Sequence, residues 1–364
     1  MRSERNDERF MLRALELALK AKGNTSPNPM VGSVVVKNGR IIAEGYHRFA
    51  GSSHAEAYAL KKAGAKARGA DLYVTLEPCC YVGRTPPCVD QIIDSKISRV
   101  IIGTKDPNPK VNGVGIRMLK QAGIEVVKGV LEKECEEINF IYNKYISEGK
   151  PFVIVKVALS LDGKIAAKDG SSKWITNSES RDAVHLLRSE VDAIMVGSGT
   201  ATSDDPLLTA RIKNKKTKNP IRIVIDGDLE ISPELKLFKQ TGKTIIIVSN
   251  HVSSKKVEPF QKIGAEIIRC KSLKGRLDLR EMLEKLGSRG IASVLVEGGA
   301  GLHSALIRDS LVDKIIAFIS PKILGGFGKD WLPFLKVPSI NEALDLKDVK
   351  ISLYNDNAMI EGNL

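Results

Sequence analysis

The sequence predicts an α/β protein of two domains, and three observations lead to this fold class. The chain has 364 residues, which is long for one compact domain. Short apolar runs typical of strands alternate with helical segments, the order that builds layers of helices on sheets. The pattern breaks at Glu148-Gly149-Lys150-Pro151. We therefore expect one domain over residues 1–148 and a second over residues 149–364.

The first half predicts a mixed α/β unit that opens with a helix. Residues 9–22 carry apolar side chains at helical spacing, and Gly23 ends that helix. Asn38-Gly39 lies between two apolar runs and is typical of a hairpin turn. The other expected helices cover residues 54–67, 88–97, 114–122 and 131–148, and the expected strands cover residues 31–36, 41–43, 71–76, 100–103 and 125–128.

The second half starts again with a strand and continues the alternation. Its pattern is that of an α/β layer structure, without an internal repeat at a fixed period. The expected strands cover residues 152–157, 193–196, 221–225, 244–248, 266–268, 293–296 and 314–319, with helices over 178–189, 277–287 and 301–310.

Composition indicates an ordinary globular protein of the cytoplasm, with 43% apolar and 27% charged residues. No apolar run approaches the roughly 18 residues that a membrane span needs. The charged start, Met1-Arg2-Ser3-Glu4-Arg5, argues against a secretory signal. Three of the five cysteines lie within ten residues, which indicates metal chemistry in a reducing compartment rather than a disulfide framework.

The net charge of +13 raises two hypotheses about partners, a nucleic acid or a phosphorylated small molecule. Lysine is spread along the chain, and the densest basic cluster is confined to residues 211–218. This distribution favours a phosphorylated small molecule over a dedicated nucleic-acid groove.

His54, Cys79 and Cys88 are the candidate metal ligands. An imidazole and two thiolates suit tetrahedral zinc with one position open for water. Glu56 supplies the proton acceptor that such a water needs. The order H-x-E followed by P-C-x-x-C is the signature of zinc nucleobase deaminases. This chain departs from it, because Val82 stands where the second cysteine is expected.

A purely structural zinc site is the alternative, with Cys80 as its fourth ligand. The expected helices make the catalytic hypothesis stronger, since His54 and Cys88 each lie at a helix start. Positive helix ends favour thiolates beside a metal. Ser52-Ser53 supplies the expected cap of the first of these helices.

Two segments around these residues resemble the pyrimidine deaminase domain of the bifunctional riboflavin-biosynthesis deaminase/reductase family. They are Thr75-Leu76-Glu77-Pro78-Cys79 and Gly83-Arg84-Thr85-Pro86-Pro87-Cys88. That family has this longer spacer between its cysteines. The resemblance implies a cytidine-deaminase-like three-layer fold, zinc held by His54, Cys79 and Cys88, and Glu56 as proton shuttle. It also implies that Asn28, within Pro27-Asn28-Pro29, binds the pyrimidine. The family commonly has serine and histidine after the first cysteine, so the role of Cys80 stays open.

The second half resembles the reductase domain of the same family, which is similar in fold to dihydrofolate reductase. The matching segments are Ala158-Leu159-Ser160-Leu161-Asp162-Gly163-Lys164, Ser172-Lys173-Trp174-Ile175-Thr176 and residues 199–211. In addition, Glu297-Gly298-Gly299-Ala300-Gly301 follows an expected strand and opens an expected helix, where glycines let main-chain amides approach a pyrophosphate. It lacks the G-x-G-x-x-G spacing of a Rossmann fingerprint.

The resemblance implies two sets of residues in the second half. Trp174 and Arg188 also have plainer interpretations, as a core tryptophan and an exposed helix residue. The expected NADPH-binding residues are Ala158, Trp174, Thr200, Asp204, Gly299, Ala300, Gly301, Leu302, His303, Ser304 and Ala305. The expected substrate-binding residues are Lys156, Ser172, Arg188, Leu208, Arg211 and Glu297, with Lys156 near the sugar.

Together these patterns predict a bifunctional enzyme of riboflavin biosynthesis. Residues 1–148 are expected to deaminate a phosphorylated ribosylaminopyrimidine with zinc, and residues 149–364 to reduce its ribosyl side chain with NADPH. Two alternatives stay open, a tRNA adenosine deaminase and a zinc-stabilised binding module. The resemblance also implies a homo-oligomer, and neither a nucleic acid nor a membrane is an expected partner.

Overall fold

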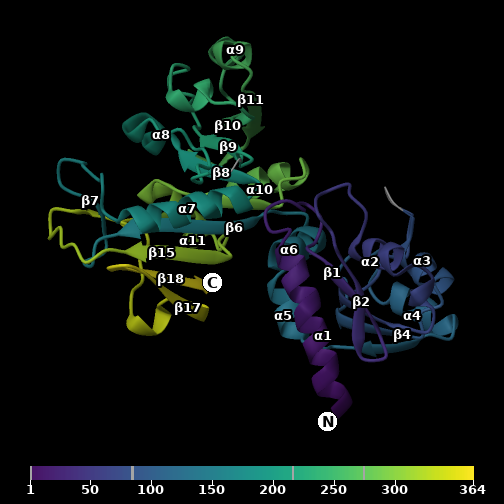
Figure 1. Ribbon diagram of the computed structural model, residues 1–364. Helices are drawn as coiled ribbons and strands as arrows, with labels where there is room; N and C mark the ends of the chain where they lie inside the picture. The colour runs from purple at the N-terminus through teal and green to yellow at the C-terminus, as the bar shows by residue number, and fades with distance from the viewer. Residues whose placement is uncertain (1, 83–85, 215–216, 274) are drawn as a thin grey trace. The chain divides into compact units, whose positions relative to one another are not determined.

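The computed structural model describes residues 2–82, 86–214, 217–273 and 275–364 (Figure 1). The chain divides into two compact units, Met1–Gly149 and Lys150–Leu364. No helix in the described ranges is long and apolar enough to cross a membrane. The expected segment Gly83-Arg84-Thr85 lies outside the described residues.

The first unit is built on a five-stranded sheet in the order β2-β1-β3-β4-β5. β1 pairs antiparallel with β2 and β3, whereas β3, β4 and β5 run parallel. The hairpin turn falls at Asn38-Gly39 as predicted, where both residues have positive φ. The strands are β1 (Gly32–Lys37), β2 (Arg40–Tyr46), β3 (Asp71–Leu76), β4 (Arg99–Thr104) and β5 (Glu125–Lys128).

Helices cover both faces of this sheet, so the unit has three layers (Figure 1). Apolar side chains of α1 and α5 pack against one face of the sheet and form one core. Those of α2, α3 and α4 pack against the opposite face and form the other core. Successive side chains of a strand point to opposite faces of the sheet. Because both faces are buried here, the strands appear in the sequence as continuous apolar runs. The helices are α1 (Arg2–Leu19), α2 (Ala55–Ala63), α3 (Cys88–Asp94), α4 (Val114–Gln121), α5 (Glu132–Glu137) and α6 (Phe140–Glu148), and a 3₁₀ turn spans Gly64–Ala67.

Two local expectations for this unit are wrong. The helix expected over residues 131–148 is split into α5 and α6, because the Asn139 side chain turns to hydrogen-bond both main-chain groups of Met30. Ser52 and Ser53 do not cap α2. His54 occupies the cap position without a side-chain cap bond, while the Ser52 hydroxyl accepts from the Phe49 amide.

The second unit has a nine-stranded sheet in the order β11-β10-β9-β8-β14-β6-β15-β18-β17. The first seven strands run parallel, and β18 and β17 add an antiparallel edge. These strands are β6 (Phe152–Leu159), β8 (Ala193–Gly197), β9 (Ile221–Ile225), β10 (Thr244–Ser249), β11 (Glu266–Cys270), β14 (Ser293–Val296), β15 (Lys314–Ile319), β17 (Lys347–Tyr354) and β18 (Asn357–Asn363). Short strands β7 (Lys164–Ala166) with β16 (Lys329–Asp330), and β12 (Ser272–Leu273) with β13 (Arg276–Leu277), form two small ribbons.

Helices lie on both faces of this sheet as well. α10 and α11 pack with one core, and α8 and α9 with the other. The helices are α7 (Ser178–Glu190), α8 (Ser198–Asp204), α9 (Ser254–Lys262), α10 (Leu279–Gly287) and α11 (Ala300–Arg308), with 3₁₀ turns at Lys236–Lys239 and Ile340–Glu342. The parallel strands end along one edge, which is where open α/β sheets bind ligands.

Several elements of the second unit were not expected from the sequence, among them α8, α9 and the terminal hairpin of β17 and β18. α8 is rich in glycine, serine and threonine, which are weak helix formers, and α9 contains Pro259. The terminal hairpin of β17 and β18 lies beyond the last expected strand. Its edge strand is exposed along almost its whole length, so it shows no apolar run of the buried type.

Candidate functional site

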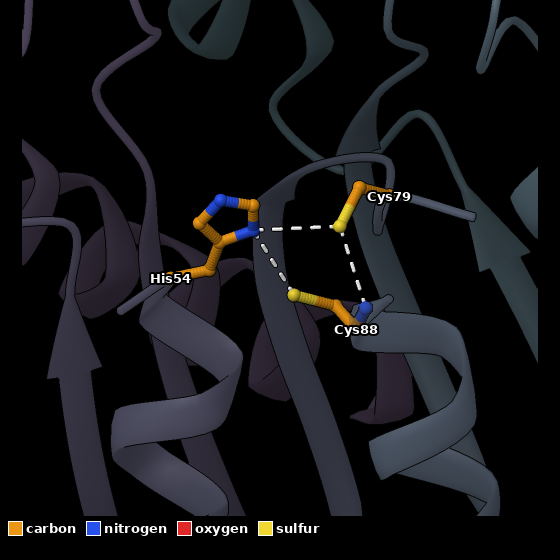
Figure 2. A group of neighbouring side chains, drawn as sticks. All are labelled: His54, Cys79 and Cys88. Atoms are coloured by element: carbon orange, nitrogen blue, oxygen red, sulfur yellow. Dashed lines mark hydrogen bonds between the residues drawn. The ribbon is translucent and has the colours of Figure 1, made fainter. Parts of the chain in front are cut away.

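The three expected metal ligands meet in the first unit (Figure 2). His54 precedes α2, Cys88 is the first residue of α3, and Cys79 follows β3. The His54 Nδ1 atom lies 3.2 Å from the Cys88 sulfur and 3.4 Å from the Cys79 sulfur. All three ligand atoms lie within 4.8 Å of one another, and this donor set suits tetrahedral zinc.

Electrostatics around these sulfurs favour a thiolate. Hydrogen bonding from the Cys88 thiol, together with that from His54, lowers the pKa of Cys79 against the opposing effect of burial. The main-chain amide of Cys88, at the start of α3, donates to the Cys79 sulfur over 3.3 Å. As expected, His54 and Cys88 of the cluster both lie at helix starts, which supplies positive potential beside the sulfurs.

Glu56 lies beside the ligands without belonging to their cluster. Its side chain is 3% exposed, and burial raises the pKa of its carboxyl group, although His54 opposes the rise. A buried carboxyl group of this kind can hold or release a proton near neutral pH. The arrangement is therefore that of an acid/base group next to a metal position.

Cys80 is turned away from the three ligands. Its thiol donates to the main-chain carbonyl of Lys110 over 3.5 Å, and it packs against the core between the sheet and α2. In the described part of the chain, the metal cluster consists of His54, Cys79 and Cys88 alone. This geometry disfavours the structural zinc alternative, which needs Cys80 as a fourth ligand.

Asn28 contacts a histidine that the sequence did not single out. Its Nδ2 atom lies 3.4 Å from His47 Nε2, and the ring of His47 stands edge-on to that of His54 with 5.6 Å between centroids. Burial lowers the pKa of His47, so its imidazole is neutral at physiological pH. Asn28 and His47 thus form a polar edge beside the candidate metal position.

Two buried carboxyl groups support the loop that carries Cys79. Glu77 accepts from the amides of Gly113 and Ile116 at the start of α4, at 2.9 and 3.1 Å. Asp106 accepts from the Tyr142 hydroxyl over 2.8 Å, and burial raises the pKa of Asp106 to about 6. Glu77 directly follows the apolar strand β3 and is buried, and this position is the sequence signal for its supporting role.

A cavity of about 900 Å³ opens in the second unit. Its walls come from β6, α7, α8 and the glycine turn after β14. The expected residues that line it are Lys156, Ala158, Ser172, Trp174, Arg188, Thr200, Asp204, Leu208, Arg211, Glu297, Gly299, Ala300 and His303. Gly301, Leu302, Ser304 and Ala305 are not among its lining residues, and Leu302 and Ala305 pack against the core.

The glycine turn brings main chain close to α8. A Cβ atom on Gly298 would lie 2.7 Å from the Thr200 side chain, and Gly299 has a φ of 90°. Both positions therefore need glycine. α11 begins at Ala300, so its free amides face the cavity wall, an arrangement suited to an anionic ligand.

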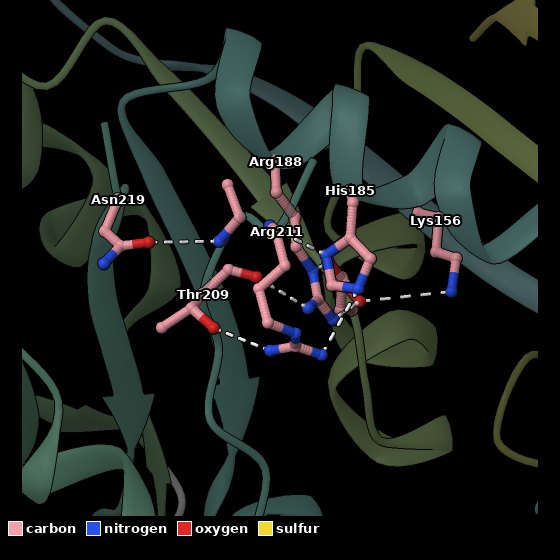
Figure 3. A network of polar contacts seen from close by, with 8 residues as sticks. Lys156, His185, Arg188, Thr209, Arg211 and Asn219 are labelled. Carbon is pink, nitrogen blue, oxygen red and sulfur yellow. Dashed lines mark hydrogen bonds and ion pairs between the residues drawn. The ribbon is translucent and has the colours of Figure 1, made fainter. Parts of the chain in front are cut away.

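Arg188 forms an ion pair with Glu297, and both side chains line the cavity. Figure 3 shows Arg188 beside His185 and Arg211 in this polar network. Arg188 donates to the two carboxylate oxygens at 2.5 and 2.8 Å, and Lys156 Nζ lies 4.0 Å from one of them. The interpretation of Arg188 as an exposed helix residue is wrong, since its side chain is 14% exposed. Its planar fork binds both carboxylate oxygens of Glu297.

Trp174 is exposed at the cavity rather than buried in the core. Its side chain is 61% exposed, which contradicts its plainer interpretation as a core tryptophan. The Arg181 guanidinium lies over the ring, 4.5 Å from its centroid. The Lys322 ammonium donates to the main-chain carbonyl of Trp174. A flat, exposed ring at a cavity rim is suited to packing against a planar ligand.

Comparison with known proteins assigns both units. The family model of the RibD C-terminal domain matches residues 151–358, and that of the cytidine and deoxycytidylate deaminase zinc-binding region matches residues 4–104. The riboflavin biosynthesis protein RibD of Aquifex aeolicus is 43% identical over 356 residues, which cover 97% of each chain. The chain belongs to the RibD family. The RibD of Escherichia coli is 41% identical and covers 88% of this chain and 89% of its own.

Solved structures of the RibD family share this architecture over 99% of both chains. Acinetobacter baumannii RibD superposes with a TM-score of 0.90 at 32% identity. The Thermotoga maritima diaminohydroxyphosphoribosylaminopyrimidine deaminase/5-amino-6-(5-phosphoribosylamino)uracil reductase superposes with a TM-score of 0.87 at 38% identity. The predicted fold class is confirmed, with a cytidine-deaminase-like unit and a dihydrofolate-reductase-like unit.

As a member of the RibD family, this chain is an enzyme of riboflavin biosynthesis with a zinc-binding deaminase domain and a reductase domain. A tRNA adenosine deaminase would have no function for residues 151–358. Because these residues match the RibD C-terminal domain, that alternative is disfavoured. A binding module without activity is likewise disfavoured by full-length similarity to enzymes.

Proposed function

We propose that residues 1–148 deaminate 2,5-diamino-6-ribosylamino-4(3H)-pyrimidinone 5′-phosphate, and that residues 149–364 then reduce the ribosyl side chain to ribityl. The observation that carries the first half is the cluster of His54, Cys79 and Cys88 with buried Glu56 beside it. The observation that carries the second is the cavity with its buried cations and glycine turn.

Zinc fits the first cluster, because one imidazole and two cysteine sulfurs converge there and the thiolate form of Cys79 is favoured. When bound, zinc supplies an acidified water as the nucleophile. Glu56 would hold a proton beside the metal position and deliver it to the departing amino group, which leaves as ammonia. Asn28, beside His47, offers its amide to the pyrimidine and holds the reacting carbon near the metal position.

NADPH is the proposed reductant of the second unit. Trp174 provides a flat surface for the cofactor, and the turn at Gly299 with the start of α11 provides amides for its pyrophosphate. Ala158, Thr200 and Asp204 line the same wall of the cavity. NADPH supplies the hydride when bound.

Lys156 is the proposed proton donor to the sugar oxygen. Burial lowers the pKa of Lys156, although Glu297 opposes that effect. A lysine held in this way can lend a proton to an oxygen that gains negative charge during reduction. Ser172, Leu208 and Arg211 line the cavity around it and complete the proposed substrate site.

Separation of the two activities tests the assignment. Glu56→Gln is expected to abolish ammonia release while NADPH-dependent reduction of deaminated substrate continues at close to the wild-type rate. Lys156→Met is expected to do the reverse, and it serves as the matched control. Product analysis by mass spectrometry, with and without NADPH, follows both steps. Loss of both activities in either folded variant would contradict two independent sites.

We also propose that the chain forms a homodimer through the edge strand β17. Val349, Ile351 and Leu353 alternate along this strand and are 49%, 67% and 76% exposed. An antiparallel edge can continue its ladder into a second copy about a two-fold axis and cover this apolar row. Light scattering after size exclusion is expected to give a dimer, and Ile351→Lys a monomer. A wild-type monomer at micromolar concentration would refute the proposal.

We propose a cytoplasmic location because the cysteines are not joined in disulfides. None of the five cysteines forms a disulfide, which suits a reducing compartment. The expected test is fractionation of cells that produce the natural chain, followed by an immunoblot. Recovery in a compartment that maintains disulfides would contradict it.

A further inference from the structure

Arg181 is a cavity residue to which the proposed function assigns no role. It lies on α7, and its guanidinium carbon stands over the ring of Trp174, 4.5 Å from the ring centroid. Its Nη1 atom also donates to the main-chain carbonyl of Thr176 over 2.7 Å. The side chain of Arg181 therefore joins α7 at two points to the segment that carries Trp174.

The main chain of Trp174 is held by a second element. Lys322, which follows β15, donates its ammonium N–H to the Trp174 carbonyl. The segment of Lys322 is tied in turn to the loop after β6, because the Asp162 carboxylate accepts from the amides of Leu324 and Gly325 at 3.1 and 2.7 Å. With its main chain held in this way, Trp174 keeps the rotation of its indole about the side-chain bonds as its main freedom.

The indole needs support because it is not packed in a core. Its side chain is 61% exposed, and exposed side chains change rotamer on fast timescales. A ligand that stacks on a mobile ring must order it, and this lowers the affinity. The Arg181 guanidinium restrains the ring before a ligand arrives, and it leaves the opposite face of the indole available for stacking.

Arg181 is suited to this task by its shape and by its free charge. Arginine can stack its flat guanidinium on an aromatic face and donate from the edge of the same group, which is what Arg181 does with Trp174 and Thr176. Arg188 on the same helix is bound by Glu297, whereas no carboxylate in the described ranges forms an ion pair with Arg181. No acidic side chain therefore competes with Trp174 for the guanidinium.

We propose that Arg181 is a positioning residue for NADPH, which holds the indole of Trp174 in the orientation that stacks on a planar ring of the cofactor. Arg181 then lowers KM for NADPH by ordering Trp174 in advance, without a contact of its own with the reacting atoms. The inference rests on the proposed function, because it takes Trp174 as a surface for the cofactor.

Steady-state kinetics of the reductase step test this role. Arg181→Met removes the cation and its N–H groups, and it is expected to raise KM for NADPH by about 3- to 10-fold, the gain typical of ordering one side chain in advance. Its kcat and its KM for the pyrimidine substrate are expected to stay at wild-type values. Arg181→Lys keeps a cation over the ring, so its KM for NADPH should stay within about twofold of wild type.

Lys168→Met is the matched control, because the Lys168 ammonium also stands over an aromatic ring of this unit, 4.6 Å from the centroid of Phe327. Lys168 is not among the residues that line the cavity, so its loss should leave KM for NADPH unchanged. An Arg181→Met variant with unchanged KM for NADPH, or with an equal rise in KM for both substrates, would overturn the inference.

A second background distinguishes positioning from direct contact with the cofactor. In Trp174→Leu the ring is absent, so adding Arg181→Met is expected to raise KM for NADPH no further. If the two losses multiply instead, Arg181 acts on the cofactor independently of Trp174, and the positioning role is refuted.

Time-resolved fluorescence anisotropy separates failure of this inference from failure of the proposed function. It is measured without nucleotide in the Trp331→Phe background, where Trp174 is the one emitting tryptophan. Arg181→Met is expected to increase the amplitude of fast ring motion, and Arg181→Lys to leave it at the wild-type value. If the enzyme does not use NADPH, this increase would still support the restraint of Trp174 by Arg181, and equal amplitudes in all three proteins would overturn it.

Discussion

Arg188 and Glu297 bind each other through two hydrogen bonds, of 2.5 and 2.8 Å, with only 14% and 6% of their side chains exposed. Burial alone would raise the pKa of Glu297, but Arg188, followed by Lys156, lowers it to about 2. The carboxylate therefore stays charged throughout the working pH range. One buried anion thus balances two buried cations, so this part of the cavity carries a net positive charge.

Removal of Glu297 is expected to destabilise the second unit more than removal of Arg188. Glu297→Gln leaves two buried cations without a counter-charge, whereas Arg188→Met leaves Glu297 with Lys156, 4.0 Å away. Breaking a buried pair typically costs about 3–5 kcal/mol, and we expect the Gln variant to lie in that range and the Met variant below it. Denaturant titration followed by tryptophan fluorescence measures this unit, because both tryptophans, Trp174 and Trp331, belong to it.

The variant Lys156→Met combined with Glu297→Gln is the control for that prediction. It removes one of the two stranded cations, so part of the lost stability should return. Equal losses for the two single variants would mean that Lys156 does not stabilise the carboxylate.

Zinc content is expected to depend on Cys79 and Cys88 but not on Cys80. Serine at either of the first two positions removes one of three ligands, and metal affinity should fall by orders of magnitude. Cys80→Ser is the matched control, because its thiol donates to the Lys110 carbonyl outside the ligand cluster. Zinc per chain is measured by atomic emission after dialysis against a weak chelator. Loss of zinc from the Cys80 variant would support the alternative hypothesis of a structural zinc site with four ligands.

The metal ligands could be predicted from sequence because residue type and order carry the chemistry. His54, Cys79 and Cys88 stand next to helix starts that apolar periodicity locates, so their convergence followed from local structure. Long-range pairing was different. No residue pattern indicates that Glu297, 109 positions away, binds the guanidinium of Arg188. The same holds for His185 and Arg211, which meet only because α7 and the segment after α8 pack together.

Element prediction failed for similar reasons. Buried strands such as β3 and β14 have the predicted bounds, since burial on both faces requires continuous apolar residues. The exposed strand β17 owes its form to pairing with β18. α8 is formed from poor helix formers because Ala201 packs in the core beneath it. Tertiary contacts outweigh propensity in both cases.

Stability of the second unit is expected to fall as pH drops from about 7 towards 4 because of His303. Trp331 donates its indole N–H to His303 Nδ1 over 2.9 Å, and burial lowers the pKa of His303 to about 4. The unfolded chain, with a histidine pKa of about 6.5, binds a proton in this range that the folded chain excludes. The shift corresponds to about 3 kcal/mol lost between these pH values.

His303→Gln is the comparison for the pH prediction. Glutamine does not titrate and its carbonyl can accept from Trp331, so the part of the pH dependence due to this residue should disappear. Unfolding free energies from tryptophan fluorescence at several pH values give both curves. Parallel curves for variant and wild type would show that His303 titrates alike in the folded and unfolded chain.

NADPH is expected to quench the tryptophan fluorescence of the native protein, chiefly through Trp174. This ring is 61% exposed at the cavity, whereas Trp331 is held by its hydrogen bond to His303. A planar cofactor stacked on the exposed ring should absorb its emission. Trp174→Phe is expected to remove most of the quenching and to weaken NADPH binding by about 1 kcal/mol or more, while Trp331→Phe keeps the signal. Quenching that survives Trp174→Phe unchanged would place the cofactor elsewhere in the cavity, because no third tryptophan exists in the chain.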